Sequence, residues 1–259
     1  MSTGRTTPWP LLLVVAFAAF AGIATPAYAQ TFPSRPLTIV VPYPAGGVTD
    51  NLVRLLAEGM KPSLGQSIVV ENIGGGGGTI GVDHVARAAP DGYTLVLGNS
   101  ESMVFAPVTM AISYNALTDF TPVALLPSYP FLLVTTNDVP AKNLEELIAW
   151  IKAYAVTAKK RIVAAPEIPT ANEAGLPGFY TSVWNALWAP KATPKEAIAK
   201  INAAITTAMA DEKFQKRMVD LGLDMPDADQ RTPEALGALR EAEIDKWWPI
   251  LKAAGLKAE

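Results

Sequence analysis

The chain has no cysteine among its 259 residues and only one histidine, His84. Without cysteine it can carry neither a disulfide nor a lipid anchor attached to cysteine, so its stability must come from a packed core. A metal site needs several ligands, but the chain has one histidine and no carboxylates clustered at ligand spacing. A catalytic triad needs a nucleophile and an orienting acid besides the histidine. We therefore expect no metal, no cofactor and no enzymatic activity.

Clustered positive charge is also missing. Lys and Arg number 21 against 24 Asp and Glu, which gives a net charge of −3. The cations form no extended block, whereas nucleic acid and anionic lipid both require clustered cations. The 50% of hydrophobic residues, with 22 prolines and 19 glycines, is typical of a globular chain with many turns. A small ligand is the partner that this composition favours.

The first 29 residues have the pattern of a secretory signal peptide. Arg5 precedes an apolar run over residues 11–24, and Ala27-Tyr28-Ala29 supplies the small residues of a cleavage site. The run is short for a membrane-spanning helix, which needs about 20 residues. We expect cleavage between Ala29 and Gln30 and release of the mature protein into the periplasm.

From Leu37 onward, short apolar runs alternate with amphipathic stretches. The first run is continuously apolar, as in strands that are buried on both faces of a sheet. In the stretch after it, apolar residues recur at helical spacing: Leu52, Leu55, Leu56 and Met60. The predicted elements are strands 37–41, 67–71 and 93–97 and helices 49–61 and 80–88. This order predicts a parallel sheet covered by helices.

The second half of the chain is less regular. The predicted elements are strands 122–126, 131–135 and 154–157 and helices 143–152, 194–210, 211–221 and 232–254. Pro194 and Pro233 follow threonines, as expected in the first turn of a helix. Helix 143–152 runs into strand 154–157 without turn residues, although a connection of at least about 2 residues is expected. This junction indicates that something is missing.

The segment best suited to a ligand is the loop between the first strand and the first helix. Its glycines let the backbone approach a ligand and present N–H groups, and the helix N-terminus adds partial positive charge. No lysine follows, and the glycine spacing differs from the dinucleotide pattern, so carboxylate fits better than phosphate. Thr49 has an alternative role as helix N-cap, and Asp50 as a partner of the helix dipole. The candidate residues are Tyr43, Pro44, Ala45, Gly46, Gly47, Thr49 and Asp50.

Two other loops supply further candidates. Gly78 is the last of five consecutive glycines and Thr79 follows it; the alternative role of this run is that of a flexible loop. Asn99 and Ser100 follow strand 93–97 at the carboxyl edge of the sheet, where open α/β folds bind ligands. We expect His84 to be a partly exposed helix residue without a catalytic partner. The tryptophans are expected in the core or in an interface: Trp184, Trp188, Trp247 and Trp248.

The segment Pro42-Tyr43-Pro44-Ala45-Gly46-Gly47-Val48-Thr49-Asp50 resembles the receptors of tripartite tricarboxylate transporters, also called Bug receptors. Further matching stretches are Pro33-Ser34-Arg35-Pro36, Val70-Glu71-Asn72, Gly77-Gly78-Thr79-Ile80-Gly81, residues 86–94, residues 173–179 and the turn 189–194. The resemblance implies an α/β, periplasmic-binding-protein-like (type II) fold with two lobes and mixed, mostly parallel sheets. It also implies that the loop holds a carboxylate through backbone amides and ordered water, without a cofactor.

One segment of the family has no counterpart in this chain. In the family, several strands and helices separate the segments that match 143–152 and 154–157, so roughly 70 residues, about half of a small lobe, are missing between Ala153 and Tyr154. The resemblance therefore implies an incomplete second lobe. We expect residues 30–118 and 187–259 to form lobe 1 and residues 119–186 to form lobe 2.

The function that these observations favour is capture of a small carboxylated solute for the membrane permease subunits of a tripartite tricarboxylate-type transporter. We expect a monomer when the chain is fully folded. Two alternatives stay open: an extracytoplasmic sensory receptor that feeds a two-component system, and, less favoured, an exported hydrolase.

Overall fold

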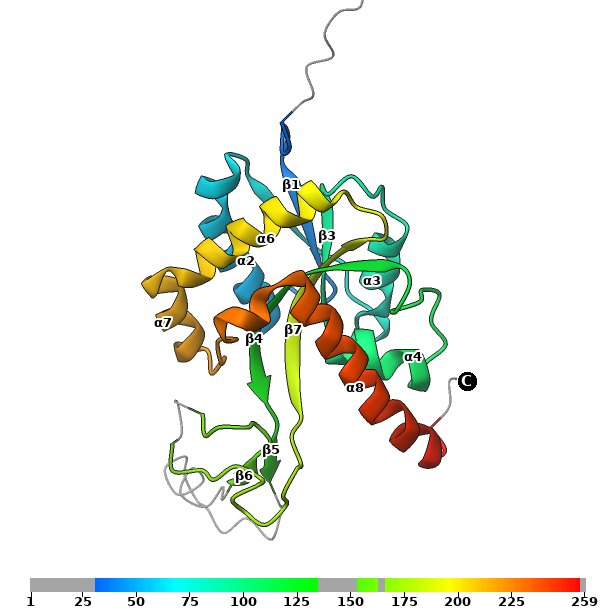
Figure 1. Ribbon diagram of the computed structural model, residues 1–259, viewed down its shortest axis with the longest axis vertical. Coiled ribbons are helices and arrows are strands. Elements are labelled where there is room, and N and C mark those ends of the chain that lie inside the picture. Colours follow the sequence, from blue (N-terminus) through cyan, green and yellow to red (C-terminus); the bar gives the residue numbers. More distant parts are fainter. Residues whose placement is uncertain (1–30, 135–152, 163–165, 257–259) are drawn as a thin grey trace, which may run out of the picture. The chain divides into compact units, whose positions relative to one another are not determined.

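The computed structural model describes residues 31–134, 153–162 and 166–256 (Figure 1). The described residues from Pro33 onward form one compact unit. The signal peptide predicted at 1–29 and the helix predicted at 143–152 lie outside the described residues. None of the described helices is both long and apolar enough to cross a membrane.

A five-stranded sheet lies at the centre of this unit. Its strands, in spatial order, are β2 (Ile68–Asn72), β1 (Leu37–Val41), β3 (Thr94–Asn99), β7 (Ser182–Pro190) and β4 (Phe120–Pro130). β1 pairs in parallel with β2 and β3, whereas β7 pairs antiparallel with β3 and β4. Four of the five strands therefore run in one direction and β7 opposes them. The predicted mixed, mostly parallel sheet is confirmed.

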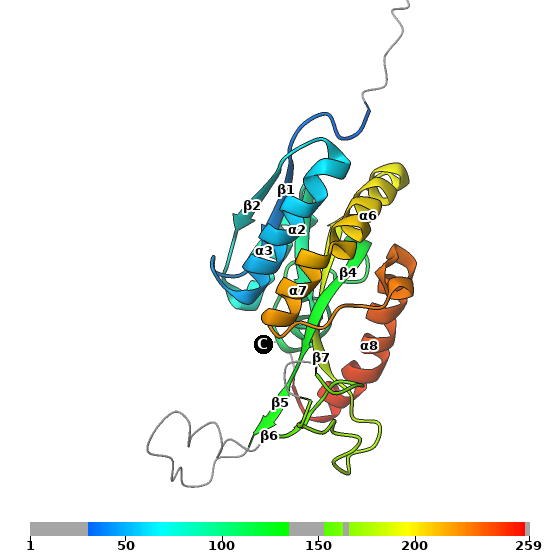
Figure 2. The ribbon, with the colours of Figure 1, turned by 90° about the vertical axis from the view of Figure 1, so that its left-hand side faces the viewer.

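Helices cover both faces of the sheet (Figures 1 and 2). They are α2 (Val48–Leu64), α3 (Thr79–Ala86), α6 (Lys195–Ala210), α7 (Glu212–Asp220) and α8 (Pro233–Ala253). α2 and α6 pack so closely that a Cβ atom on Gly59 would lie 2.8 Å from the Cβ of Ala208. On the other face, one buried cluster joins Val82 of α3 and Leu236 of α8 to Trp188 of the sheet.

The buried stripe of α2 differs from the prediction at one residue. Leu52, Leu56 and Met60 are fully buried, but Leu55 is 36% exposed and Val53 is buried instead. Positions 52, 53, 56, 57 and 60 form the stripe that faces the sheet and α6. The helical spacing grouped Leu55 with the buried residues, but it lies at the border of this stripe.

β4 is longer than the predicted strand 122–126. It contains Pro122, Pro127 and Pro130, and its register against β7 shifts between Pro122 and Ala124 and again after Leu126. Such bulges accommodate prolines, which have no N–H to donate to a neighbouring strand. The chain continues directly from this strand into the smaller sheet.

The smaller sheet has two described strands, β5 (Leu132–Val134) and β6 (Ala153–Val156), which pair antiparallel (Figure 1). Thr157 ties their end to the rest of the unit, because its N–H donates to the carbonyl of Phe131 at 3.1 Å. The buried hydroxyl of Thr157 also accepts a hydrogen bond from the Phe131 N–H at 3.1 Å and donates to the carbonyl of Thr181. β6 begins one residue before the predicted start at Tyr154.

The three C-terminal helices are confirmed to within a few residues. Asp211 caps α7 by accepting a hydrogen bond from the N–H of Phe214, and Thr232 caps α8 by accepting one from the N–H of Ala235. Pro194 is itself the N-cap of α6 and not a first-turn residue as predicted. The expected tryptophan core is confirmed for Trp184 and Trp188, which are 3% and 0% exposed.

Candidate functional site

The predicted ligand loop lies between the end of β1 and the start of α2. Because β1 and β3 are parallel neighbours, this loop and Ser100 meet at the carboxyl edge of the sheet. The glycine turn after β2 reaches the same place, since a Cβ atom on Gly78 would lie 3.1 Å from the phenolic oxygen of Tyr43. The fold therefore brings the three predicted segments to one edge.

The start of α2 presents free hydrogen-bond donors. Gly47 occupies the N-cap position and offers no side-chain cap, and the first helical bond runs from the N–H of Asn51 to the carbonyl of Gly47. Among the described residues, no group accepts a hydrogen bond from the N–H groups of Gly47, Val48 or Thr49. Val48 is 44% exposed, so solvent reaches this helix end. Such an N-terminus favours an anion.

Thr49 does not cap the helix, because it lies inside α2 and is 8% exposed. Pro44 and Ala45 are exposed in the loop before it. Gly46 has φ of +82°, a conformation that favours glycine, and a Cβ atom there would meet no atom within 4 Å. Its N–H already donates to Asp50, so it is not one of the free donors.

Asp50 holds the loop from inside. Its Oδ2 accepts hydrogen bonds from the N–H of Gly46 at 2.8 Å and from Nε of Arg54 at 2.9 Å. Its Oδ1 accepts one from Nδ2 of Asn72 at 2.9 Å, and the same nitrogen donates to the carbonyl of Tyr43 at 3.0 Å. Arg54 is the main cause that lowers the pKa of Asp50 to about 2. Asp50 is therefore charged, 2% exposed and turned toward the loop.

Asn99 and Ser100 were predicted in a loop, but Asn99 is the last residue of β3 and Ser100 begins a helical turn over residues 101–105. Asn99 Oδ1 accepts a hydrogen bond from the N–H of Ser102 at 3.0 Å, and Ser102 Oγ accepts one from the N–H of Asn99 at 3.1 Å. This reciprocal pair caps the turn. The Ser100 hydroxyl is buried and has no hydrogen-bond partner in the described structure.

Tyr43 packs against the glycine turn. Burial, followed by the negative charge of Glu101, raises the pKa of its phenol, while the nearby Asn99 amide opposes that shift. Its oxygen is buried and finds no hydrogen-bond partner among the residues described. Thr79 donates its hydroxyl to the carbonyl of Gly76 at 2.8 Å, which closes the turn. Gly78, with φ of +96°, leaves the space that the Tyr43 ring occupies.

Asn185 was not predicted from the sequence; it lies opposite Asn99 on the neighbouring strand β7. It is fully buried, and its Nδ2 donates to the carbonyl of Pro127 at 2.9 Å, but its Oδ1 has no partner within the described part of the chain. Unsatisfied buried polar atoms are rare and call for a ligand or water. Its position inside the apolar run from Val183 to Ala189 was the available signal.

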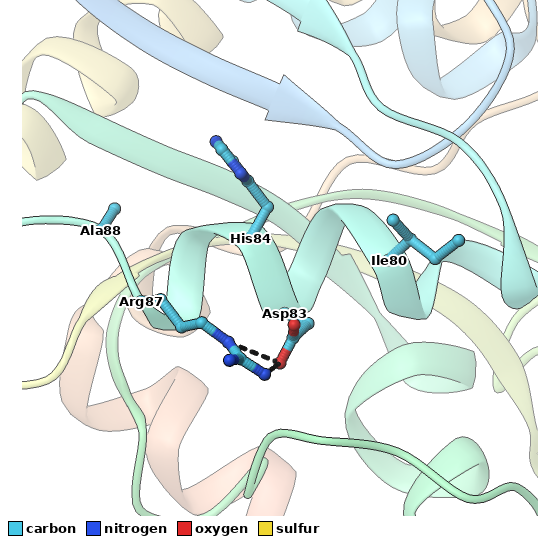
Figure 3. Close-up of a pocket in the computed structure, with 5 residues that line it drawn as sticks. All are labelled: Ile80, Asp83, His84, Arg87 and Ala88. Carbon is cyan, nitrogen blue, oxygen red and sulfur yellow. Dashed lines mark hydrogen bonds and ion pairs between the residues drawn. The ribbon is translucent and has the colours of Figure 1, made fainter.

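A shallow depression on the outer surface of α3 is separate from the candidate ligand site (Figure 3). It is lined by Ile80, Asp83, His84, Arg87 and Ala88. Asp83 and Arg87 form an ion pair at 3.0 Å, and His84 is exposed, as predicted. No group of His, Cys, Asp and Glu in the described residues could hold a metal ion.

Comparison with known sequences identifies the group to which this architecture belongs. The sequence matches the tripartite tricarboxylate transporter family receptor over residues 52–155 and 151–256. The chain belongs to this family. Members of the family are solute receptors, which confirms the expectation that the protein is not an enzyme.

Individual relatives are similar to this chain over most of its length. An UPF0065 protein of Agrobacterium vitis is 31% identical over 298 residues, which cover 87% of this chain and 86% of the relative. Protein BugT of Bordetella pertussis is 28% identical over 321 residues, 95% of this chain and 98% of the relative.

Solved structures of the family confirm the predicted periplasmic-binding-protein-like fold. MatC of Rhodopseudomonas palustris, with bound malate, is 32% identical, with a TM-score of 0.73, over 83% of this chain and 98% of that chain. The periplasmic binding protein BugD is 31% identical, with a TM-score of 0.72, over 88% of this chain and 100% of that chain.

Proposed function

We propose that the protein captures a small carboxylated solute in the periplasm and presents it to the permease subunits of a tripartite tricarboxylate transporter. The observation that carries this proposal is the exposed start of α2, whose N–H groups have no acceptor among the described residues. Family membership supports it, as does MatC, a relative whose structure contains malate. A receptor of this kind binds the solute and leaves its chemistry unchanged.

In this proposal the backbone supplies the main contact. A solute carboxylate accepts hydrogen bonds from the N–H groups of Gly47, Val48 and Thr49, and the partial positive charge of α2 adds to the attraction. Asp50 positions the loop and does not touch the solute, because its oxygens are occupied by Gly46, Arg54 and Asn72. The remaining contacts come from the residues lining the same edge: Tyr43, Pro44, Ala45, Gly78, Thr79, Asn99 and Ser100.

The backbone contact can be tested with a matched pair of glycine substitutions. Gly46→Val should weaken carboxylate binding about tenfold, because φ of +82° is strained for valine and the loop must shift. Gly222→Val is the control, since Gly222 has φ of +73° and equally open space but lies between α7 and α8. Titration followed by NMR compares the two variants. Equal losses of binding in both would contradict a backbone site at the start of α2.

Export is part of the proposed function. We expect removal of residues 1–29 and a mature protein that begins at Gln30 in the periplasmic fraction. Intact-mass measurement of the fractionated protein tests this. A chain that retains residues 1–29 and sediments with membranes would contradict it.

We further propose that the second lobe, residues 119–186, is incomplete, and that residues 30–118 and 187–259 make up the first. The alignment with the Agrobacterium relative spans 298 positions but includes 87% of 259 residues, about 225, so about 73 positions have no counterpart here. The alignment with BugT spans 321 positions and includes 95%, about 246 residues, which leaves about 75. The two stretches matched by the family meet at residues 151–155, which supports a gap near Ala153 and Tyr154.

An incomplete lobe has a consequence for affinity. A solute held by one wall stays partly hydrated and gains no energy from closure, so we expect a dissociation constant on the order of millimolar, about 4 kcal/mol. NMR titration of this chain with malate, other di- and tricarboxylates, amino acids and aromatic acids measures it. Micromolar binding would overturn the incomplete cleft, and absence of binding to every carboxylate would overturn the receptor function.

A further inference from the structure

We propose that Glu101 makes the site selective for carboxylates that also carry a protonated amine. The inference rests on the proposed function, because it concerns the solute bound at the start of α2. Glu101 is the first residue of the helical turn 101–105, whose N-cap is Ser100, and it is exposed. It was not among the residues predicted from the sequence.

The carboxylate of Glu101 lies beside the glycine turn. A Cβ atom on Gly77 would lie 3.4 Å from Oε1 of Glu101, and a Cβ atom on the next residue, Gly78, would lie 3.1 Å from the phenolic oxygen of Tyr43. The carboxylate and the phenol therefore flank the same two residues of the turn. Glu101 is also close enough to Tyr129 of β4 that its charge adds to burial in raising the pKa of that phenol. One carboxylate thus lies among three segments of the candidate site.

This carboxylate has no counter-ion in the described structure. The ion pairs found there are Arg35–Asp91, Arg54–Asp50, Arg87–Asp83 and Arg161–Glu173. Asp50, the other carboxylate at this edge, is neutralised by Arg54, so the charge of Glu101 is uncompensated. An acidic residue in the first turn of a helix is favourable for the helix dipole. The helix dipole therefore accounts for an acidic residue at position 101, but it does not account for the position of the Glu101 carboxylate beside the glycine turn.

The charge has opposite effects on two classes of solute. A simple dicarboxylate brings a like charge toward Glu101, which costs binding energy at short range. A solute with an ammonium group can place it against Glu101 while its carboxylate meets the start of α2, and charge-assisted hydrogen bonds of this kind are strong. The arrangement therefore distinguishes solutes by the group beside the carboxylate.

Three ligands with the same four-carbon skeleton separate the effects: succinate, malate and aspartate carry hydrogen, hydroxyl and ammonium at one carbon. We expect the unmodified protein to bind aspartate about tenfold more tightly than succinate in NMR titrations at constant ionic strength. Glu101→Gln should abolish this preference. Glu58→Gln, which removes the same charge from an exposed position in the middle of α2, should retain it.

The outcomes are distinguishable. Binding of succinate as tight as that of aspartate, or an aspartate preference that survives Glu101→Gln, would overturn the role of Glu101 and leave carboxylate capture intact. Absence of binding to all three ligands would overturn the role of Glu101, and absence of binding to every carboxylate of the wider panel would overturn both proposals. Thermal unfolding followed by circular dichroism shows whether each variant is folded, and Glu101→Asp, which keeps the charge, should restore part of the preference.

Discussion

The main sheet and the β5–β6 pair are stabilised in different ways. β1 and β3 have paired neighbours on both sides, and Ile39, Val40 and Leu95 are fully buried. β5 and β6 have three and four residues and, among the described strands, pair only with each other apart from a bridge between Val156 and Thr170. Nearby apolar side chains are 39–51% exposed: Phe131, Leu176 and Phe179.

The difference shows which region fixes the candidate site. A two-stranded sheet is only marginally stable by itself, whereas buried apolar surface stabilises the larger sheet. The loop before α2, Ser100 and Asn185 all belong to the larger sheet or to its carboxyl edge. The geometry of the anion site should therefore persist even when the β5–β6 pair is perturbed.

The largest test of this comparison is truncation of an aromatic side chain in each region. Trp188→Ala removes a fully buried ring that contacts Arg240 and Trp184, and should lower the free energy of unfolding by about 3–5 kcal/mol. Phe131→Ala removes a ring that is 43% exposed, and should cost about 1 kcal/mol or less. Urea unfolding followed by circular dichroism compares them. Equal losses of unfolding free energy in the two variants would contradict the proposed difference between the two sheets.

A smaller effect is expected from the carboxylate that holds the loop. Because the pKa of Asp50 is lowered from 3.8 to about 2, its contribution is fully present above pH 4 and is lost as the pH falls toward 2. Half of Arg54 is exposed, so we discount the ion pair and expect Asp50→Asn to cost about 1 kcal/mol at pH 7. The difference from the unmodified protein should shrink as the pH falls toward 2.

The control for Asp50 is Asp83→Asn, which removes a similar ion pair with Arg87 from the exposed surface of α3. It should change stability by less than about 0.5 kcal/mol and leave binding unchanged. Urea unfolding at several pH values, together with solute titration, measures both. A pH dependence that is the same in the Asp50→Asn variant as in the unmodified protein would contradict the assigned role.

The most local effect should come from Thr157→Val. The buried hydroxyl of Thr157 joins Phe131 to Thr181, so its loss should release the end of the β5–β6 pair at a cost of about 1 kcal/mol. Hydrogen exchange should increase at the amides of Val156 and Thr157 and stay unchanged at Val40 in the main sheet. Faster exchange at Val40 would show that the two regions unfold together.

Much of the fold could be predicted from the sequence, because its strands are continuous apolar runs bounded by glycine and proline. β1 was predicted at its observed bounds, and β2, β3 and α3 to within two residues. The exposure of Leu55 and the length of β4 did not follow from the sequence, for a shared reason. Both depend on packing against distant segments and on bulges, which local periodicity does not specify.

The candidate site could be predicted only as a loop. Its position followed from glycine and the helix start, but the role of Asp50 depends on Asn72, 22 residues away, and on the fold that brings them together. Asn99 was predicted as a ligand-binding residue of a loop, but it ends β3 and its side chain caps the turn at Ser102. Asn185 and Glu101 became candidates only when strand pairing and the glycine turn placed them beside the loop.

The placement of β7 between β3 and β4 has a consequence for how the chain reaches its native state. The main sheet cannot close until the segment from Ser182 to Pro190 is available, so its formation requires closure of the loop that leaves β4 at Pro130. Loop-closure entropy grows slowly, by about 0.6 kcal/mol for each doubling of length. Gain or loss of residues within that loop should therefore have little effect on the free energy of forming the main sheet. Its effect on the structure that the loop residues themselves form should be much larger.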